Sequence, residues 1–323
     1  MFYCIKIFYN FDTKSVFQKD TNMIPDWYFH CKSTAEPIGS ISVTVISLFR
    51  PRLGRLFDTI VHTNHPQSYV KLYKRTESIM KAIVHKANTR GYFDHGWLQT
   101  AHTFSFADYY DPERVHFGAL RVLNDDRIAP GTGFGMHAHR NMEIVSIPLR
   151  GGLEHRDSMG HVSVLHKGEV QVMSAGTGVH HSESNLSKDE TTEFLQIWVV
   201  PAVENVEPRY VNAPIEKLIV PNQISTIVYP YSAHHPEENE KRLWIYQRAW
   251  FSIAKLDKGK KVHYRLYNAD SFGVYLFVIN GAIDAESYAL EKRDGIGIGD
   301  AEEFDITARE DSTVLLIEVP PVE

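Results

Sequence analysis

Two stretches decide the fold, Gly131-Thr-Gly-Phe-Gly-Met-His137-Ala-His139-Arg-Asn-Met-Glu143 and Gly176-Thr-Gly-Val-His-His181-Ser-Glu183-Ser-Asn185. Between them, apolar and polar residues alternate in a period of two, which predicts β-strands. Side chains at i and i+2 of a strand lie on one face, roughly 7 Å apart. His137 therefore shares a face with His139, and His181 shares one with Glu183. On a helix each pair would diverge by about 200°, so the spacing favours a β scaffold.

If the two strands face each other inside a small barrel, three imidazoles and one carboxylate can converge on one point. This mixed nitrogen and oxygen set suits a divalent first-row metal, with iron(II) favoured and manganese, nickel, copper or zinc as alternatives. Structural zinc usually takes cysteines, and both cysteines of the chain, Cys4 and Cys31, lie far from these stretches. Without a cation, such a polar cluster would be costly to bury in a dry barrel.

Composition excludes several other classes of protein. The chain has 323 residues, 43% of them hydrophobic and 23% charged, as in an ordinary globular protein of about two domains. A net charge of −6 gives no electrostatic footprint for direct binding of nucleic acid. Two cysteines rule out a disulfide framework and fit a reducing cytoplasm. Neither a secretory signal nor an apolar run long enough to cross a membrane is visible.

Residues 1–79 differ from the rest, with 10 Lys and Arg against 6 Asp and Glu and no sustained period of two or 3.6. We expect a poorly ordered extension, or a native start at Met80; a small interaction arm is the remaining alternative. From Lys81 onward, strands are expected at intervals that indicate barrels or sandwiches. Asn124-Asp-Asp-Arg127 is interpreted as a tight turn, residues 202–213 as a linker and residues 233–242 as a short helix or a solvated loop.

Strands of the first series are predicted at residues 103–107, 117–124, 143–149, 162–166, 169–173 and 193–200. The second series, predicted at residues 244–256, 261–267, 272–279, 296–299 and 313–319, has the same rhythm. The prediction is thus an all-β chain with an N-terminal barrel over residues 80–205 and a second barrel of similar plan over residues 206–323.

Several stretches together resemble the bacterial pirins of the cupin superfamily. They are His102-Thr-Phe-Ser-Phe-Ala-Asp-Tyr-Tyr-Asp-Pro112, Gly131–Glu143, Glu154-His-Arg-Asp-Ser-Met-Gly160 and residues 174–185. The resemblance covers the chain from about Met80 and implies two stacked cupin barrels, with one metal in the first. Matched residue by residue, it implies His137, His139, His181 and Glu183 as ligands. The second barrel departs from the pattern at His263-Tyr-Arg265, so we expect no metal there.

The resemblance also implies two possible functions. Some pirins have quercetin 2,3-dioxygenase activity, which would use O2 and a small aromatic, flavonol-like substrate, with Glu183 as the general base. Others are redox-sensitive regulators, and the acidic chain would then act through a protein partner. A mouth open to a planar ligand would favour the enzyme.

Other polar residues receive less specific interpretations. Glu143 is either a ligand or a hydrogen-bond partner of a ligating imidazole, and the second role is favoured. His155, His161 and His166 are expected at the surface or rim, and His180 as exposed or packed. Phe134, Met136, Met142 and Met173 either line a pocket or belong to the core, and Trp198 and Trp244 are assigned to the core.

Overall fold

The computed structural model describes residues 28–32, 45–50, 54–57, 81–231, 243–267 and 273–322. It divides the chain into two units, Met1–Ser78 and Ile79–Glu323. In the first unit, β1 (Tyr28–Lys32), β2 (Val45–Arg50) and β3 (Gly54–Phe57) form a three-stranded antiparallel sheet. The prediction of a poorly ordered extension over residues 1–79 lies mainly outside the described residues. The short helix or solvated loop predicted at residues 233–242 lies wholly outside them.

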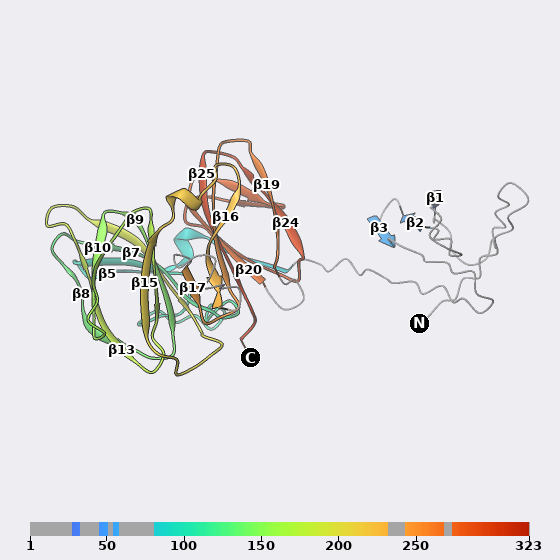
Figure 1. The fold of residues 1–323 in the computed structure, drawn as a ribbon. Coiled ribbons are helices and arrows are strands. Elements are labelled where there is room, and N and C mark those ends of the chain that lie inside the picture. Colours follow the sequence, from blue (N-terminus) through green and yellow to red (C-terminus); the bar gives the residue numbers. More distant parts are fainter. Residues whose placement is uncertain are drawn as a thin grey trace, which may run out of the picture. The chain divides into compact units, whose positions relative to one another are not determined.

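The first barrel of the second unit is built from two antiparallel sheets of seven and four strands, in the orders β15-β12-β9-β14-β7-β6-β5 and β11-β10-β13-β8. Its strands are drawn in cyan to yellow in Figure 1. Their bounds are β5 Gly91–Asp94, β6 Leu98–His102, β7 Leu120–Ile128, β8 Gly133–His139, β9 Glu143–Arg150, β10 Gly152–Asp157, β11 Val162–His166, β12 Glu169–Ser174, β13 Val179–Asn185, β14 Thr192–Val199 and β15 Arg209–Pro214.

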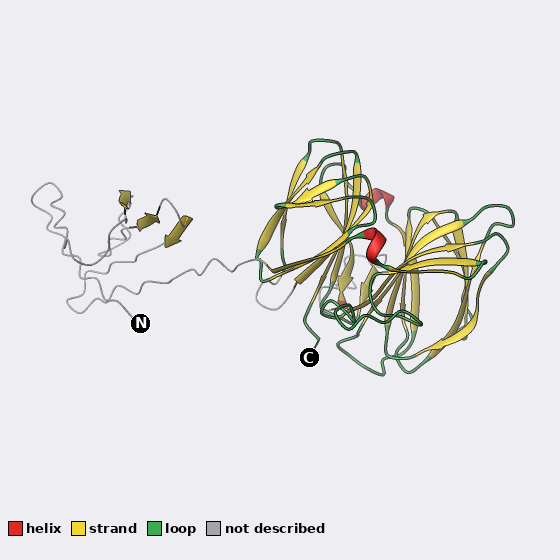
Figure 2. Ribbon diagram, turned by 180° about the vertical axis from the view of Figure 1, so that it is seen from behind, coloured by secondary structure: helices red, strands yellow, loops and turns green. Residues whose placement is uncertain are grey.

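The second barrel repeats this plan with sheets ordered β17-β16-β18-β25-β20-β23-β4 and β19-β24-β21-β22. The bounds are β4 Lys81–His85, β16 Ile224–Pro230, β17 Leu243–Ile245, β18 Trp250–Leu256, β19 Lys261–Arg265, β20 Gly273–Asn280, β21 Ile283–Ala285, β22 Tyr288–Leu290, β23 Gly295–Gly299, β24 Glu303–Ala308 and β25 Ser312–Val319. Two 3-10 turns, η1 (Ala87–Thr89) and η2 (Glu216–Leu218), are drawn in red in Figure 2. The prediction of an all-β chain with two barrels is confirmed.

The two barrels share one large apolar core. Leu123, Val145 and Leu195 of the first barrel belong to the same buried cluster as Phe251 and Tyr275 of the second. Each seven-stranded sheet thus buries one face against the other, and the opposite face turns into its own barrel. This arrangement leaves the interior of the first barrel free to hold polar side chains.

Three local predictions are wrong. Residues 124–127 are not a turn but the middle of β7, which runs on to Ile128. Residues 103–107 contain only an isolated bridge from Phe106, and the expected linker at residues 202–213 contains most of β15. The domain limits at residues 80, 205 and 206 stay predictions. Two strands pair with the barrel on the other side of the predicted limit at 205 and 206: β4 pairs with β23 of the second barrel, and β15 pairs with β12 of the first.

Among the described residues, no helix has both the length and the apolar character that crossing a bilayer requires.

Candidate metal centre and cavity

Strands β8 and β13 bring three histidines together. They pair antiparallel with His137 opposite His181, and a register shift follows between His181 and Glu183. One ring nitrogen each from His137, His139 and His181 lies within 4.8 Å of the others. The ring centroids are 4.4 to 4.9 Å apart. The i, i+2 spacing on one strand and the cross-strand pair therefore produce a cluster of imidazoles from only two elements.

The ring nitrogens of this cluster fit a metal. Nδ1 of His137 lies 2.8 Å from the carbonyl oxygen of Gly135, to which only a protonated nitrogen can donate. That hydrogen bond assigns the tautomer and leaves the lone pair of Nε2 available. His181 is 1% exposed, and neither of its ring nitrogens has a hydrogen-bond partner. A buried imidazole without partners costs free energy, which a bound cation would offset.

The imidazoles of His139 and His181 are neutral at neutral pH. Burial, reinforced by the neighbouring imidazoles, lowers the pKa of His139 to about 4 and that of His181 to about 3. A neutral imidazole keeps the lone pair that coordinates a metal. His139 and His181 therefore require no deprotonation at physiological pH before a divalent ion binds.

Glu183 is buried and lies on β13, the strand that carries His181, but it is not part of the three-histidine cluster. Its Oε1 accepts hydrogen bonds of 3.2 Å from Ser146 Oγ and from Gln171 Nε2, and its Oε2 accepts one of 2.6 Å from Gln196 Nε2. The four ligands expected from the sequence do not form one group; Glu183 instead shares a second group with His181 and His155. The carboxylate is thus oriented by three donors at the edge of the candidate metal centre.

Glu143 belongs to neither of these two groups. Its carboxylate accepts a hydrogen bond of 2.7 Å from Ser174 Oγ. Burial raises its pKa to about 7, against the hydrogen bonds from Ser174 and the backbone of Tyr246 and the charge of Arg209. These contacts tie β9 to the side of the barrel that faces the second barrel.

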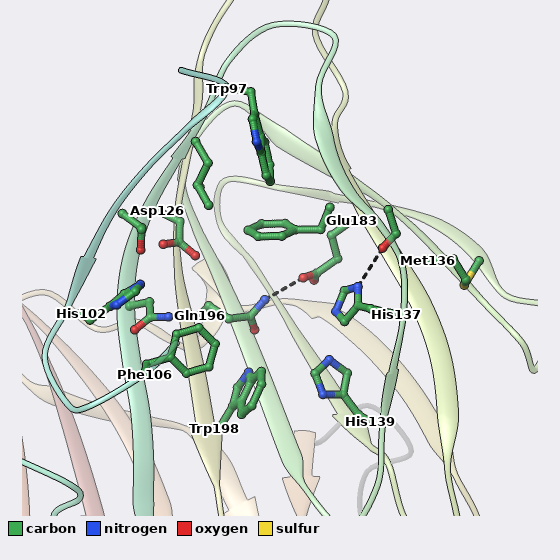
Figure 3. Close-up of a pocket in the computed structure, with 15 residues that line it drawn as sticks. Trp97, His102, Phe106, Asp126, Met136, His137, His139, Glu183, Gln196 and Trp198 are labelled. Atoms are coloured by element: carbon green, nitrogen blue, oxygen red, sulfur yellow. Dashed lines mark hydrogen bonds between the residues drawn. The ribbon is translucent and has the colours of Figure 1, made fainter. Parts of the chain in front are cut away.

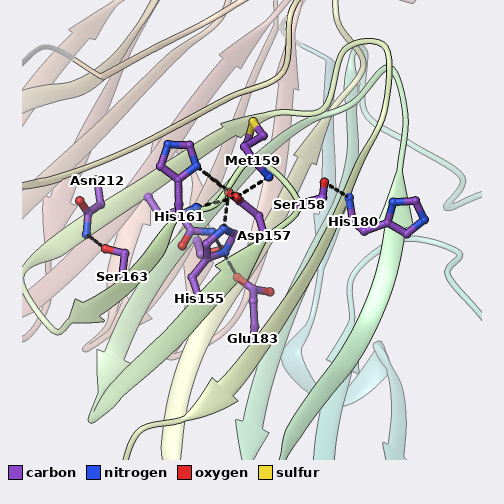
Figure 4. Close-up of polar contacts among 11 residues, drawn as sticks. His155, Asp157, Ser158, Met159, His161, Ser163, His180, Glu183 and Asn212 are labelled. Atoms are coloured by element: carbon purple, nitrogen blue, oxygen red, sulfur yellow. Dashed lines mark hydrogen bonds and ion pairs between the residues drawn. The ribbon is translucent and has the colours of Figure 1, made fainter.

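His155 is the histidine whose surroundings the sequence-based prediction missed. Expected at the surface or rim, it is fully buried, with Nε2 3.0 Å from Oδ2 of Asp157 and its ring stacked on Tyr210 at 4.2 Å between centroids. Figure 4 shows that Asp157 also binds His161, whose Nδ1 lies 2.9 Å away. Burial alone would raise the pKa of Asp157, but the hydrogen bonds from both histidines outweigh it and lower that pKa. The pair formed by His155 and Asp157 packs against the candidate metal centre, since the ring centroids of His155 and His181 are 5.3 Å apart.

The remaining histidines agree with their interpretations, since the side chain of His161 is 43% exposed and His166 and His180 are exposed. In the second barrel, His263 is half-exposed and engages the carboxylates of Asp305 and Glu303 at 2.9 and 3.3 Å. These two ion pairs raise its pKa.

A cavity of about 420 Å³ opens beside the cluster (Figure 3). Aromatic side chains supply much of its wall, including Trp198, which the sequence assigned to the core and whose ring packs edge-on against His139. Met136, 61% exposed, also lines it. The cavity is lined by Trp97, Leu98, Thr100, His102, Phe106, Asn124, Asp126, Phe134, Gly135, Met136, His137, His139, Glu183, Gln196 and Trp198.

The sequence-based prediction also missed Asn124 and Asp126, because both were assigned to a turn. The available signal was alternation: Leu120, Val122, Asn124, Asp126 and Ile128 occupy every second position of one strand. Asp126 is 3% exposed, and burial raises its pKa to about 7.

Comparison with known proteins supports this architecture. Residues 83–199 match the family model of pirin, and residues 234–319 match that of the quercetinase C-terminal cupin domain. The chain is 40% identical over 238 residues to quercetin 2,3-dioxygenase of Escherichia coli K12, across 73% of this chain and 98% of that protein. It is 39% identical over 225 residues to a pirin-like protein of Caulobacter vibrioides, across 70% of this chain and 94% of that protein.

Solved structures give the same result. The bacterial pirin YhhW of Escherichia coli in complex with nickel(II) matches with a TM-score of 0.68 and 36% identity, over 75% of this chain and all of that one. The expected pair of cupin-type domains is therefore confirmed.

Proposed function

The chain belongs to the pirin family, and from that premise we propose that it is a metal-dependent dioxygenase of the quercetin 2,3-dioxygenase type, cleaving a flavonol-like phenol with O2. One observation carries the proposal: three imidazoles form a cluster, and two of them, His137 and His139, line an open cavity that has aromatic sides. Relatives at about 40% identity carry the name of this activity.

The donor set supports a divalent transition metal held by His137, His139 and His181, with Glu183 at its edge. Nitrogen and oxygen donors of this kind suit iron(II), the ion that we propose, and accept manganese, nickel, copper or zinc. When bound, such an ion supplies Lewis acidity that lowers the pKa of a phenol, together with a redox path to O2. The buried ring of His181 has no hydrogen-bond partner, and a bound cation would give one of its two nitrogens a partner.

Glu183 is the proposed general base. Its carboxylate borders the cavity and would accept the proton of the substrate hydroxyl, which leaves a phenolate oxygen. The donors Ser146, Gln171 and Gln196 come from three different strands and restrict its rotation. A fixed carboxylate shortens the search for the geometry in which this proton transfers.

The aromatic walls suit a planar substrate. Phe134 and Trp97 pack edge to face at 5.2 Å on one side of the cavity, and Phe106 and Trp198 do so at 5.2 Å on another. Rings held in this way offer flat, apolar surfaces that exclude water from a bound aromatic ring. The exposed rim at Met136 leaves the mouth open, which favours an enzyme over a regulator that acts through a protein partner.

Quercetin turnover tests the proposal. The full chain is reconstituted anaerobically with iron(II), then quercetin and air are added, and loss of the flavonol absorption band is followed together with release of carbon monoxide. We expect turnover in the wild type and none in His137→Ala, because that variant loses one of three metal-holding imidazoles. Stoichiometric metal without turnover, for each of the metals named, would reject the dioxygenase and favour the regulatory alternative.

A further inference from the structure

A row of polar side chains crosses the interior of the seven-stranded sheet in the first barrel. The strand register sets five of them opposite one another on consecutive strands, and they are His102 on β6, Asn124 on β7, Gln196 on β14, Ser146 on β9 and Gln171 on β12. A neighbouring register places Thr100 opposite Asp126. Buried polar groups must find partners, so the partners of this row indicate what it is for.

One half of the row is directed at Glu183 and is satisfied within the protein, apart from Oε1 of Gln171, which has no partner. Gln196, Ser146 and Gln171 all donate to the carboxylate of Glu183. Ser146 Oγ also lies 3.1 Å from Oε1 of Gln196. This half therefore has a structural role in orienting the proposed base.

In the other half, each side chain has one buried atom without a partner. Oγ1 of Thr100, Nδ1 of His102, Oδ1 of Asn124 and Oδ1 of Asp126 are buried atoms without a hydrogen bond, in residues that are 3 or 4% exposed. Thr100 lies near enough to Asp126 to affect its carboxyl, but the two groups do not meet the geometry of a hydrogen bond. All four side chains line the cavity. Figure 3 shows His102 and Asp126 across the cavity from His137 and His139.

We propose that Thr100, His102, Asn124 and Asp126, the polar wall, bind hydrogen-bonding groups at the end of the substrate that lies away from the metal ligands. This inference rests on the proposed function and narrows its substrate class to planar aromatic compounds that carry several hydroxyl or carbonyl groups. Four buried polar atoms left unpaired cost stability, and a ligand that pairs with them recovers that cost on binding. An aromatic substrate without such groups would leave the wall unpaired.

Two flavonols distinguish binding at the polar wall from binding at the metal centre. Quercetin is hydroxylated on its outer rings, whereas 3-hydroxyflavone keeps the hydroxyl and ketone that face a metal but has no other hydroxyl. Each is titrated anaerobically into the iron(II)-loaded full chain, so that binding is measured without turnover. We expect Thr100→Val and Asn124→Leu each to weaken quercetin binding about fivefold to tenfold, as for one lost hydrogen bond, and to leave 3-hydroxyflavone unchanged.

Thr103→Val is the matched control. The Thr103 hydroxyl is also buried without a partner, and the residue is 0% exposed, but it does not line the cavity. Both threonine variants should keep or raise the Tm, since each removes an unpaired buried hydroxyl, yet only Thr100→Val should weaken quercetin binding. This pairing separates a loss of ligand contact from a loss of fold.

The outcomes are distinct. If Thr100→Val and Asn124→Leu keep the wild-type preference for quercetin, water satisfies these groups and the polar wall is rejected, while the dioxygenase proposal stands. If the wild type binds neither flavonol, the proposed function fails and the wall inference falls with it. A preference for quercetin that is lost in both variants and kept in Thr103→Val supports the inference.

Discussion

At the scale of single residues, the orientation of Glu183 comes from three strands of the opposite sheet. Gln196, Ser146 and Gln171 present donors to the carboxylate, and none of them belongs to β8 or β13, the strands that carry the three histidines. The groups that orient the base thus lie on a different sheet from the three imidazoles, although Glu183 and His181 share β13. Metal binding and proton transfer can therefore be perturbed separately.

Glu183→Gln should lower kcat by about 10²-fold to 10⁴-fold, the usual loss on removing a general base, and should retain most of the metal. The amide nitrogen replaces one of the two carboxylate oxygens, so it faces the donors of that oxygen, and the amide cannot take up the substrate proton. Steady-state kinetics with quercetin and metal analysis of the same sample measure both effects.

Glu143→Gln is the matched control, because Glu143 is also a buried carboxylate but contacts Ser174 instead of the histidine cluster. Its kcat should stay near the wild-type value. Equal losses of kcat in the two variants would argue against Glu183 as the base.

The sequence predicts the surroundings of a residue well when its neighbours in space are also close to it along the chain. His137 and His139 can be placed on one face because strand geometry alone relates positions i and i+2. His155 was missed because its burial depends on Tyr210, a residue 55 positions away that stacks on its ring. Asp126 was missed because Asn and Asp favour turns, and only the cavity explains polar residues in the middle of a buried strand.

At the scale of elements, the turn before β13 sets the position of His181. Gly176 has φ +46°, and a Cβ there would overlap the carbonyl oxygen of Val206. Two backbone hydrogen bonds hold this turn, from Asn141 N to the oxygen of Gly176 and from Thr177 N to that of Val206. Crowding at this turn is therefore transmitted to the start of the strand that carries the metal ligand.

Gly176→Ala should lower the free energy of unfolding by about 2–4 kcal/mol, combining left-handed strain with overpacking. Gly131→Ala isolates the strain: Gly131 has φ +66° with nothing within 4 Å of the added Cβ, so about 1 kcal/mol is expected. Denaturant unfolding of both variants measures the difference. Similar losses for the two would show that Val206 moves aside and that the turn is not crowded.

Element bounds were predicted best where alternation is strong. β11 matches its predicted range, β9 and β12 each run one residue further, and β14 is shifted by one residue towards the N-terminus. β15 was missed because Arg209-Tyr-Val-Asn-Ala-Pro214 is polar and ends in proline, the composition that an edge strand tolerates. Its place at the edge, paired only with β12, cannot be read from local pattern.

At the scale of the whole molecule, the two barrels are joined by a shared core and by β4, which precedes the first barrel in the chain but pairs with β23 of the second. The sequence repeats one strand rhythm twice, which is enough to predict two barrels. The pairing of β4 with β23 joins residues more than 200 positions apart, so no local pattern indicates it. The shared apolar cluster likewise requires both sheets to exist before its residues can be assigned to it.

The most direct test of the account is the iron K-edge X-ray absorption spectrum of the full chain loaded with one equivalent of iron(II). It reports the ligands of the ion in the intact protein, where either barrel could compete for it. We predict scattering from three imidazoles together with oxygen ligands, and loss of one imidazole in His137→Ala. A first shell of oxygen alone, or a spectrum unchanged by that substitution, would contradict the assignment of the metal to His137, His139 and His181.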